Sequence, residues 1–294
     1  MVINILLLSI AFIALIIGTI TDIKTREVPD WINYSLIFSG IGLRALYSSI
    51  TLDWSFLIQG ITGLIVFVIL GYIMFYAGQW GGGDSKMIMG LGALLGLNFT
   101  LQPFPLILVF LINVLLVGAV YGIIYSIALA IKHRKAFVKN TQKMLNSEKM
   151  RKFRKIKLVL LIILILPIIY MLKSGMITIP ISLSLLGLLI IAYMTFYLFV
   201  FIKAIELSAM LKSIPPEKLT EGDWIAKDVI IDGKKIVGPK DLGIEKEQIR
   251  QLIAFKKKRK LSKILIKEGI PFVPSFLIAF IISLSFGGWW MILF

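Results

Sequence analysis

Apolar stretches long enough to cross a lipid bilayer alternate with short charged segments along almost the whole chain. The hydrocarbon core of a bilayer is roughly 30 Å thick, a distance that about twenty apolar helical residues span. The pattern therefore predicts an all-α polytopic membrane protein. Eight stretches qualify, and they cover residues 2–21, 31–50, 55–77, 84–98, 104–131, 158–173, 177–202 and 270–293.

Lys and Arg residues are concentrated in every second connection between these stretches. They are dense in segments 132–157 and 203–267, and Lys24 and Arg26 occupy the first connection. Connections rich in basic residues stay in the cytoplasm. We therefore expect these connections inside, both termini outside, and Arg44 near the outer end of the second stretch, where it can snorkel or pair.

The expected fold class is all-α, with about eight transmembrane helices and a small α+β cytoplasmic domain. The connections divide the chain into five parts. These are a membrane domain of about five helices (1–131), a basic cytoplasmic loop (132–157), a transmembrane helix pair (158–203), a small cytoplasmic domain (204–269) and a C-terminal transmembrane helix (270–294).

The predicted cytoplasmic domain carries local signals for a hairpin and a helix. Segment 224–231 has the composition of a strand. Asp232-Gly233 favours a two-residue turn with positive φ, and segment 234–237 forms the return strand. Apolar residues at helical spacing follow over 245–259, which predicts a helix there.

Composition narrows the possible chemistry. The chain has 294 residues, 58% of them hydrophobic, a formal charge of +16, no cysteine and one histidine, His133. These numbers exclude an ordinary soluble domain, a thiol nucleophile and a Cys/His zinc site, and they leave a serine triad dependent on His133. Because the basic runs adjoin membrane segments, we expect them to contact anionic lipid headgroups and not nucleic acid.

Carboxyl groups at the membrane boundary are the remaining candidates. Asp22 ends the first apolar stretch and Asp84 precedes the fourth, so the topology places both at one depth on the cytoplasmic side. Crowding keeps one of two neighbouring carboxyl groups protonated while the other is ionised. The carboxylate then takes a proton from water and the acid protonates the scissile carbonyl. This mechanism needs no metal and no cofactor, and we expect neither.

Three glycines directly precede the second aspartate, at Gly81, Gly82 and Gly83. A backbone without side chains can adopt unusual φ/ψ values and lets a peptide or a helix approach Asp84 closely. The alternative is a flexible turn between helices. Gly90, Gly92 and Gly96 make the following helix smooth, and the last two have the small-xxx-small spacing of packed membrane helices.

Segments 22–33 (DIKTREVPDWIN) and 81–86 (GGGDSK) resemble the two motifs of the type IV prepilin peptidases, membrane aspartyl proteases with a Gly-x-Gly-Asp motif. In the archaeal branch, the preflagellin (prearchaellin) and prepilin peptidases, the matching aspartates are catalytic. The resemblance therefore implies that role for Asp22 and Asp84. Segment 267–276 (KEGIPFVPSF) is similar to the C-terminal part of archaeal members, although its prolines alone indicate a helix entry.

The resemblance also implies a substrate. Such enzymes remove the short, basic leader peptide from pilin-like or archaellin subunits at the cytoplasmic face, just before the hydrophobic helix of the subunit. Glu27 and Asp30 share a connection with Asp22 and are candidates for contacts with this leader. Lys24 and Arg26 lie in the same connection, so a solvated loop with neutralised charge is the alternative. Without cysteines the chain lacks the cysteine-rich domain of the bacterial enzymes, and their N-methylating activity is not implied.

Other classes of protein fit the sequence less well. A transporter or channel would use the aspartates for proton or cation relay, but it calls for acids near the bilayer midplane and matching halves. An assembly protein that only packs pilin helices is a further alternative. A serine/lysine dyad of Ser85 and Lys86 is disfavoured because adjacent helical residues do not face each other. The glycines lack the pattern of a nucleotide-binding loop.

Overall fold

The computed structural model describes residues 2–98 and 104–293, so the predicted outer connection at 99–103 lies outside the described residues. The described chain is mostly helical and has a small sheet-containing part, as expected. It divides into two compact units. The first comprises Met1–Tyr125 with Ser213–Phe294, and the second is Ser126–Lys212.

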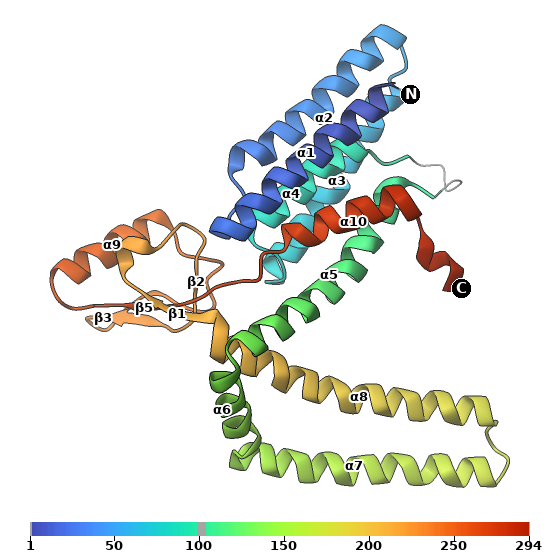
Figure 1. The fold of residues 1–294 in the computed structure, drawn as a ribbon, viewed down its shortest axis with the longest axis vertical. Coiled ribbons are helices and arrows are strands. Elements are labelled where there is room, and N and C mark those ends of the chain that lie inside the picture. Colours follow the sequence, from blue (N-terminus) through green and yellow to red (C-terminus); the bar gives the residue numbers. More distant parts are fainter. Residues whose placement is uncertain (1, 99–103, 294) are drawn as a thin grey trace. The chain divides into compact units, whose positions relative to one another are not determined.

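A helical bundle makes up most of the first unit (Figure 1). Its helices are α1 (Val2–Thr25), α2 (Asp30–Thr51), α3 (Ser55–Tyr76), α4 (Gly82–Leu95), the first part of α5 (Leu106–Lys132) and α10 (Val273–Phe286). Buried aliphatic and aromatic side chains fill the space between these helices, and the largest include Phe67, Phe110, Phe276 and Phe280. Burial of this apolar surface fixes the ends of the helices relative to one another.

Helix α4 lies against α2 and α3 at glycine positions. A Cβ atom on Gly92 would come within 2.5 Å of the Gly63 carbonyl oxygen, and one on Gly90 within 2.6 Å of Leu36 Cβ. A Cβ atom on Gly63 would likewise meet Gly96 Cα at 2.8 Å. The predicted packing role of these glycines is confirmed, because side chains at these positions would separate the helices.

Among the residues that the structure describes, five helical segments are long and apolar enough to cross a membrane, as in a multi-pass membrane protein. They are α1, α3, α5, Met150–Lys173 and Ile179–Met210. The expected eight crossings are not confirmed. Helices α4 and α10 have 14 residues each, which is about 21 Å of helix and shorter than the roughly 30 Å hydrocarbon core of a bilayer. The eighth predicted stretch ends in a 3-10 turn, Trp289–Leu293.

Arg44 of α2 caps the buried end of α4, so of the two expected outcomes, snorkelling or pairing, the structure shows pairing. The side chain is only 3% exposed. Its Nε donates to the Ala93 carbonyl at 3.1 Å, Nη2 to Leu94 at 2.8 Å and Nη1 to Phe56 at 2.9 Å. The last carbonyl groups of a helix have no partner within the helix, and no water solvates them inside a membrane protein. Arg44 supplies the missing donors.

The small sheet-containing part has two antiparallel pairings. Strands β1 (Leu211–Ile214), β5 (Ile264–Lys267) and β2 (Trp224–Ile225) form one sheet in that order, with β2 antiparallel to β5. Strands β3 (Val229–Ile231) and β4 (Lys234–Val237) form a hairpin. Its turn residues Asp232 and Gly233 have φ values of 52° and 77°, which confirms the predicted positive-φ turn.

Two details of this part differ from expectation. The predicted strand 224–231 is divided into β2 and β3, which belong to different sheets, and β1 and β5 were not predicted. Helix α9 (Lys246–Lys257) confirms the predicted helix and begins where Gln248 accepts the Glu245 N–H. Isoleucine, leucine and valine side chains from the strands and α9 form a separate small core.

The second unit is a helical hairpin with a preceding short helix. Its helices are α6 (Arg134–Leu145), α7 (Glu148–Lys173) and α8 (Ile179–Ile205), and α8 continues as a π-helical turn, Glu206–Met210. Helix α6 and the first turns of α7 lie within the segment 132–157, for which the sequence predicted a basic connection without helices of its own. Ser147 separates the two helices and caps α7 by accepting the Met150 N–H.

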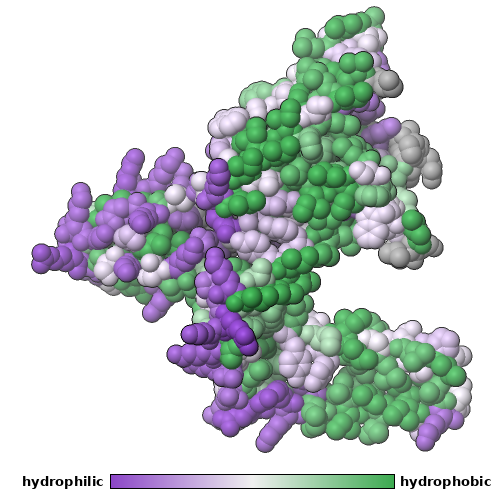
Figure 2. All heavy atoms as spheres, viewed as in Figure 1, coloured by the Kyte–Doolittle hydropathy of each residue, from purple (hydrophilic) through white to green (hydrophobic). Residues whose placement is uncertain are grey.

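Hydropathy follows this division into elements (Figure 2). Hydrophobic residues cover the bundle and the α7–α8 hairpin, whereas hydrophilic residues gather over the small sheet-containing part and over α6. An apolar surface of this extent is typical of contact with lipid and not with water.

Candidate active site

Asp22 lies in the last turns of α1 and is buried. One carboxyl oxygen, Oδ2, accepts the Val273 N–H at 2.9 Å, and the Phe272 N–H also hydrogen-bonds to this carboxyl group. Both donors belong to the N-terminal end of α10. After Asp22 the helix ends at Arg26, which has a φ of 62° and donates its N–H to the Asp22 carbonyl at 2.9 Å.

Asp84 lies in the first turn of α4 and is partly buried. Its Oδ2 accepts the Gly81 N–H at 3.1 Å. A carboxylate in a first turn satisfies a donor that the helix leaves free and interacts favourably with the helix dipole. The local sequence thus holds Asp84 in place through the backbone that precedes it.

The two carboxyl groups lie within range of mutual electrostatic repulsion. They come from α1 and α4, which pack against each other. Arg26 and Tyr121 also interact electrostatically with Asp22. Two carboxyl groups this close favour a state in which one is protonated and the other ionised, and such a pair can act as acid and base on one substrate.

Of the two features expected of the glycine run, the structure shows close approach of another segment but not unusual φ/ψ values. Gly81 is in an ordinary extended conformation, with φ −68° and ψ 166°, and Gly82 and Gly83 begin α4. Positive φ values occur among the described glycines at other positions. A Cβ atom on Gly83 would lie only 3.2 Å from Val28 Cβ. The absent side chain therefore permits close approach of α4 to the α1–α2 connection, without unusual φ/ψ.

Glu27 and Asp30, the predicted leader contacts, are both exposed. The Asp30 carboxylate pairs with Lys86 Nζ at 2.6 Å and so connects the start of α2 to α4. The ion pair of Asp30 and Lys86 also argues against a serine/lysine dyad of Ser85 and Lys86. Ser85 is buried and its hydroxyl has no hydrogen-bond partner among the described residues, whereas Lys86 is directed to Asp30.

Sequence reasoning missed two features of the site. The first is the end of α10, which supplies two donors to Asp22. The second is Arg26, whose Nη2 donates to the Tyr125 hydroxyl at 2.9 Å. Arg26 follows Asp22 by one helical turn, and this spacing was the available signal for their interaction. No local signal connects Asp22 to α10.

Metal-ligating side chains do not gather in groups of three or more anywhere in residues 2–98 and 104–293. The two aspartates alone offer too few ligands for a cation site built from protein groups. The chemistry that this arrangement supports directly is proton transfer by a pair of carboxyl groups.

The site thus defines a membrane protein with paired carboxyl groups at the end of a helical bundle. Residues 9–123, which include both aspartates, match the type IV leader peptidase family. This match confirms, for that segment, the resemblance of the two aspartate motifs to this family.

Three curated relatives are named preflagellin peptidase. The protein from Methanococcus maripaludis is 50% identical over 86 residues, which cover 29% of this chain and 36% of the relative. The one from Methanocaldococcus jannaschii is 45% identical over 83 residues, 28% of this chain and 35% of the relative. The one from Methanococcus voltae is 38% identical over 87 residues, which cover 30% of this chain and 37% of the relative. The chain therefore matches about a third of the length of these relatives.

Proposed function

We propose that the protein is a membrane aspartic endopeptidase that removes the short, basic leader peptide from prepilin or prearchaellin precursors. The observation that carries this proposal is the proximity of the Asp22 and Asp84 carboxyl groups within the segment that matches the leader peptidases. The names of the relatives favour preflagellin-type substrates. No observation favours a transporter, since both aspartates lie in terminal turns of their helices and not at mid-helix.

The proposed reaction is a hydrolysis in which protons move between the two carboxyl groups. The ionised aspartate removes a proton from a water molecule, and the resulting hydroxide attacks the scissile carbonyl carbon while the protonated aspartate donates its proton to the carbonyl oxygen. As the tetrahedral diol collapses, the C–N bond breaks and the leaving amine takes the proton held by the first aspartate. The second aspartate takes back a proton from a hydroxyl of the diol as the new carboxyl group forms. The pair then returns to its starting state with one proton.

The surroundings of the site suit a basic leader joined to an apolar helix. Glu27 is exposed in the α1–α2 connection that follows Asp22, and it can attract positive charge. Asp30 contributes less to this attraction because Lys86 already pairs with it. The apolar outer faces of the bundle provide the lipid-facing surface along which the hydrophobic helix of a precursor can dock.

We further propose that the site faces the cytoplasm, with both termini outside, in a multi-pass cell-membrane protein. The distribution of basic residues supports this orientation, because the connection that follows Asp22 contains Lys24 and Arg26 and basic connections tend to stay in the cytoplasm. Cytoplasmic precursors would reach such a site before their leader crosses the membrane.

Leader cleavage is expected to withstand chelators, thiol reagents and serine-directed reagents, because two carboxyl groups supply the whole reaction. The test incubates the purified protein in lipid with a prearchaellin and identifies the products by mass spectrometry, with and without each reagent. Absence of cleavage under all conditions contradicts the proposed function. Cleavage that a chelator removes and a divalent cation restores contradicts the metal-free mechanism.

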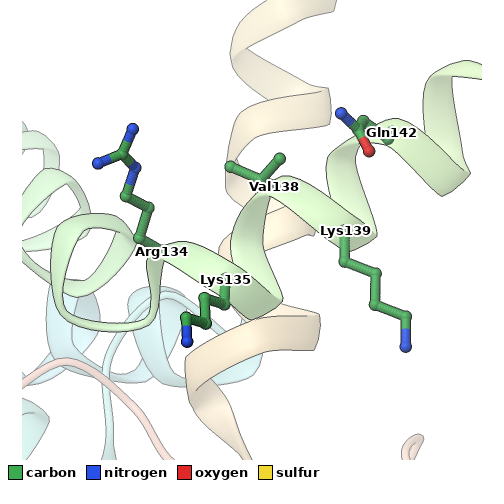
Figure 3. Close-up of a pocket in the computed structure, with 5 residues that line it drawn as sticks. All are labelled: Arg134, Lys135, Val138, Lys139 and Gln142. Carbon is green, nitrogen blue, oxygen red and sulfur yellow. The ribbon is translucent and has the colours of Figure 1, made fainter.

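One face of α6 is a candidate contact for anionic lipid headgroups. Arg134, Lys135 and Lys139 line a shallow pocket on this helix together with Val138 and Gln142 (Figure 3). The opposite face packs within the second unit, where Phe137 meets Phe201 at 5.6 Å between ring centroids. A basic face on a helix between membrane segments attracts phosphate groups.

The triple change Arg134→Gln, Lys135→Gln and Lys139→Gln is expected to weaken retention of phosphatidylglycerol roughly tenfold or more, since each basic residue near an anionic surface contributes about 1 kcal/mol. Native mass spectrometry of the detergent-solubilised protein measures the retained lipid, with phosphatidylcholine as the neutral reference. Lys173→Gln, at the far end of α7, is the matched control. Equal retention by the triple variant and the control contradicts the α6 contact.

A further inference from the structure

The first residues of α10 contact the carboxyl group of Asp22 directly. Val273 is the first residue of the helix and Phe272 precedes it, and both donate their N–H groups to this carboxyl. Pro274 follows and has no N–H to donate. The carboxyl therefore lies at the positive end of the helix dipole and accepts donors that the helix leaves free.

The same end of α10 holds the backbone that precedes Asp84. Trp80 is 3% exposed, and its ring centroid lies 5.3 Å from that of Phe276 and 6.2 Å from that of Phe272. The next residue along the chain is Gly81, whose N–H donates to Asp84. Trp80 thus fixes the segment from which Asp84 receives its hydrogen bond.

Close packing on two other helices makes this end of α10 rigid. Val273 and Phe276 are fully buried. A Cβ atom on Gly18 of α1 would lie 3.4 Å from the Val273 side chain, and one on Gly118 of α5 would lie 2.6 Å from the Phe272 ring. Side chains packed at this density cannot shift without disturbing their neighbours.

We propose that residues Phe272–Phe276, the α10 start, are a positioning element that sets the Asp22 and Asp84 carboxyl groups relative to each other. The inference rests on the proposed function, and it extends the catalytic unit beyond the matched residues 9–123. The backbone of the α10 start orients Asp22, and its aromatic side chains hold the segment before Asp84. These residues contact the Asp22 carboxyl group and the backbone before Asp84, so they act through the aspartates.

Backbone donors from α10 also support negative charge on Asp22. The described ionisable groups that act on this carboxyl are Arg26, which favours its negative charge, and Asp84 and Tyr121, whose negative forms oppose it. Loss of one N–H donor removes a hydrogen bond to the charged form. The acidic limb of the pH–rate profile reports the titration of the carboxyl pair. Loss of the hydrogen bond is therefore expected to move this limb to higher pH.

Val273→Pro removes one donor at the first helical position, where proline is common. Because a proline disfavours the helical ψ of −23° that Phe272 has before it, thermal unfolding of this variant is measured beside its activity. Val273→Ala removes most of the side chain but keeps the N–H. We expect the proline variant to move the acidic limb of kcat/KM upward by roughly one pH unit, while the alanine variant lowers the rate without moving the limb. A merely structural defect lowers the active fraction and leaves the limb in place, so equal limbs in the two variants overturn the proposal.

Substitution of Trp80 tests the aromatic contact independently and decides the question if Val273→Pro does not fold. Trp80→Ala is expected to lower kcat at least tenfold with little change in KM, and Trp80→Phe to restore kcat to within about threefold. Parental kcat in Trp80→Ala overturns the proposal. The parental protein serves as reference in every assay. If it cleaves no leader, the proposed function fails, whereas cleavage without these differences rejects only the positioning role.

Discussion

Replacement of either Asp22 or Asp84 by asparagine is expected to abolish leader cleavage. Asparagine has nearly the same shape, and its amide oxygen can still accept the Val273 N–H or the Gly81 N–H that the aspartate accepts. It can neither take a proton from water nor donate one as a carboxylic acid. General acid and base steps contribute 10²–10⁴-fold each, so we expect each single variant to lose about 10³-fold or more in rate.

The matched control for these variants is Asp53→Asn. Asp53 is exposed and bonds to the neighbouring Ser55, at the start of α3, so its charge has no part in the proposed reaction. Expression level, thermal unfolding in detergent and binding of an uncleaved precursor are measured for all three variants. Near-parental cleavage by either Asp22→Asn or Asp84→Asn contradicts the two-carboxylate mechanism, whereas loss of folding in these variants is detected separately by the unfolding measurement.

The largest loss of stability is expected from Arg44→Met. Arg44 satisfies carbonyl groups of Ala93, Leu94 and Phe56, and its guanidinium lies 4.4 Å from the Phe56 ring centroid. Methionine fills part of the space but donates no hydrogen bond. Because an unsatisfied buried polar group costs about 1–3 kcal/mol, we expect the free energy of unfolding to fall by at least about 3 kcal/mol.

Denaturation in mixed micelles measures this change for Arg44→Met beside two reference variants. Arg44→Lys keeps the positive charge but not the fork of donors, so an intermediate loss is expected. Arg250→Met removes an exposed arginine of α9 and is expected to have little effect. An unfolding curve for Arg44→Met that coincides with that of Arg250→Met rejects the capping role.

Most of the helices were predictable from the sequence, but their relation to the membrane was not. A run of apolar residues gives the same sequence pattern whether its helix crosses the bilayer or ends inside the protein. Helix α4 ends inside the bundle. Arg44 donates hydrogen bonds to its last carbonyl groups, and Gly96, with a positive φ, terminates the helix. The sequence showed only a short apolar stretch and an unexplained arginine 50 residues apart. Their pairing depends on tertiary contact, which a local pattern does not encode.

The high density of basic residues is the reason why α6 and the first turns of α7 were not predicted. Segment 132–157 has so many basic residues that a loop was the natural expectation, yet α6 has a polar face and an apolar face that packs through Phe137. Short strands β1 and β5 were also missed. Each has four residues, and their pairing joins segments far apart in the chain, so composition alone gives a weak signal.

The candidate site was predictable where topology alone was sufficient. The expected topology put the helix ends that carry Asp22 and Asp84 at one depth, and the two motifs reinforced this expectation. The hydrogen bond from α10 to Asp22 could not be predicted, because Val273 follows Asp22 by 251 positions. The prolines at 271 and 274 predicted a helix entry correctly, but nothing in their pattern indicated which side chain the free N–H groups would meet.

The hydrogen bond between Asp22 and Val273 sets an order of events during biosynthesis. Asp22 leaves the ribosome well before Val273, whose N–H group orients its carboxyl group and which follows it by 251 positions. A nascent chain inserted only as far as α8 therefore holds both aspartates without the contacts of α10. On this view the carboxyl group of Asp22 acquires its ordered surroundings only after α10 docks.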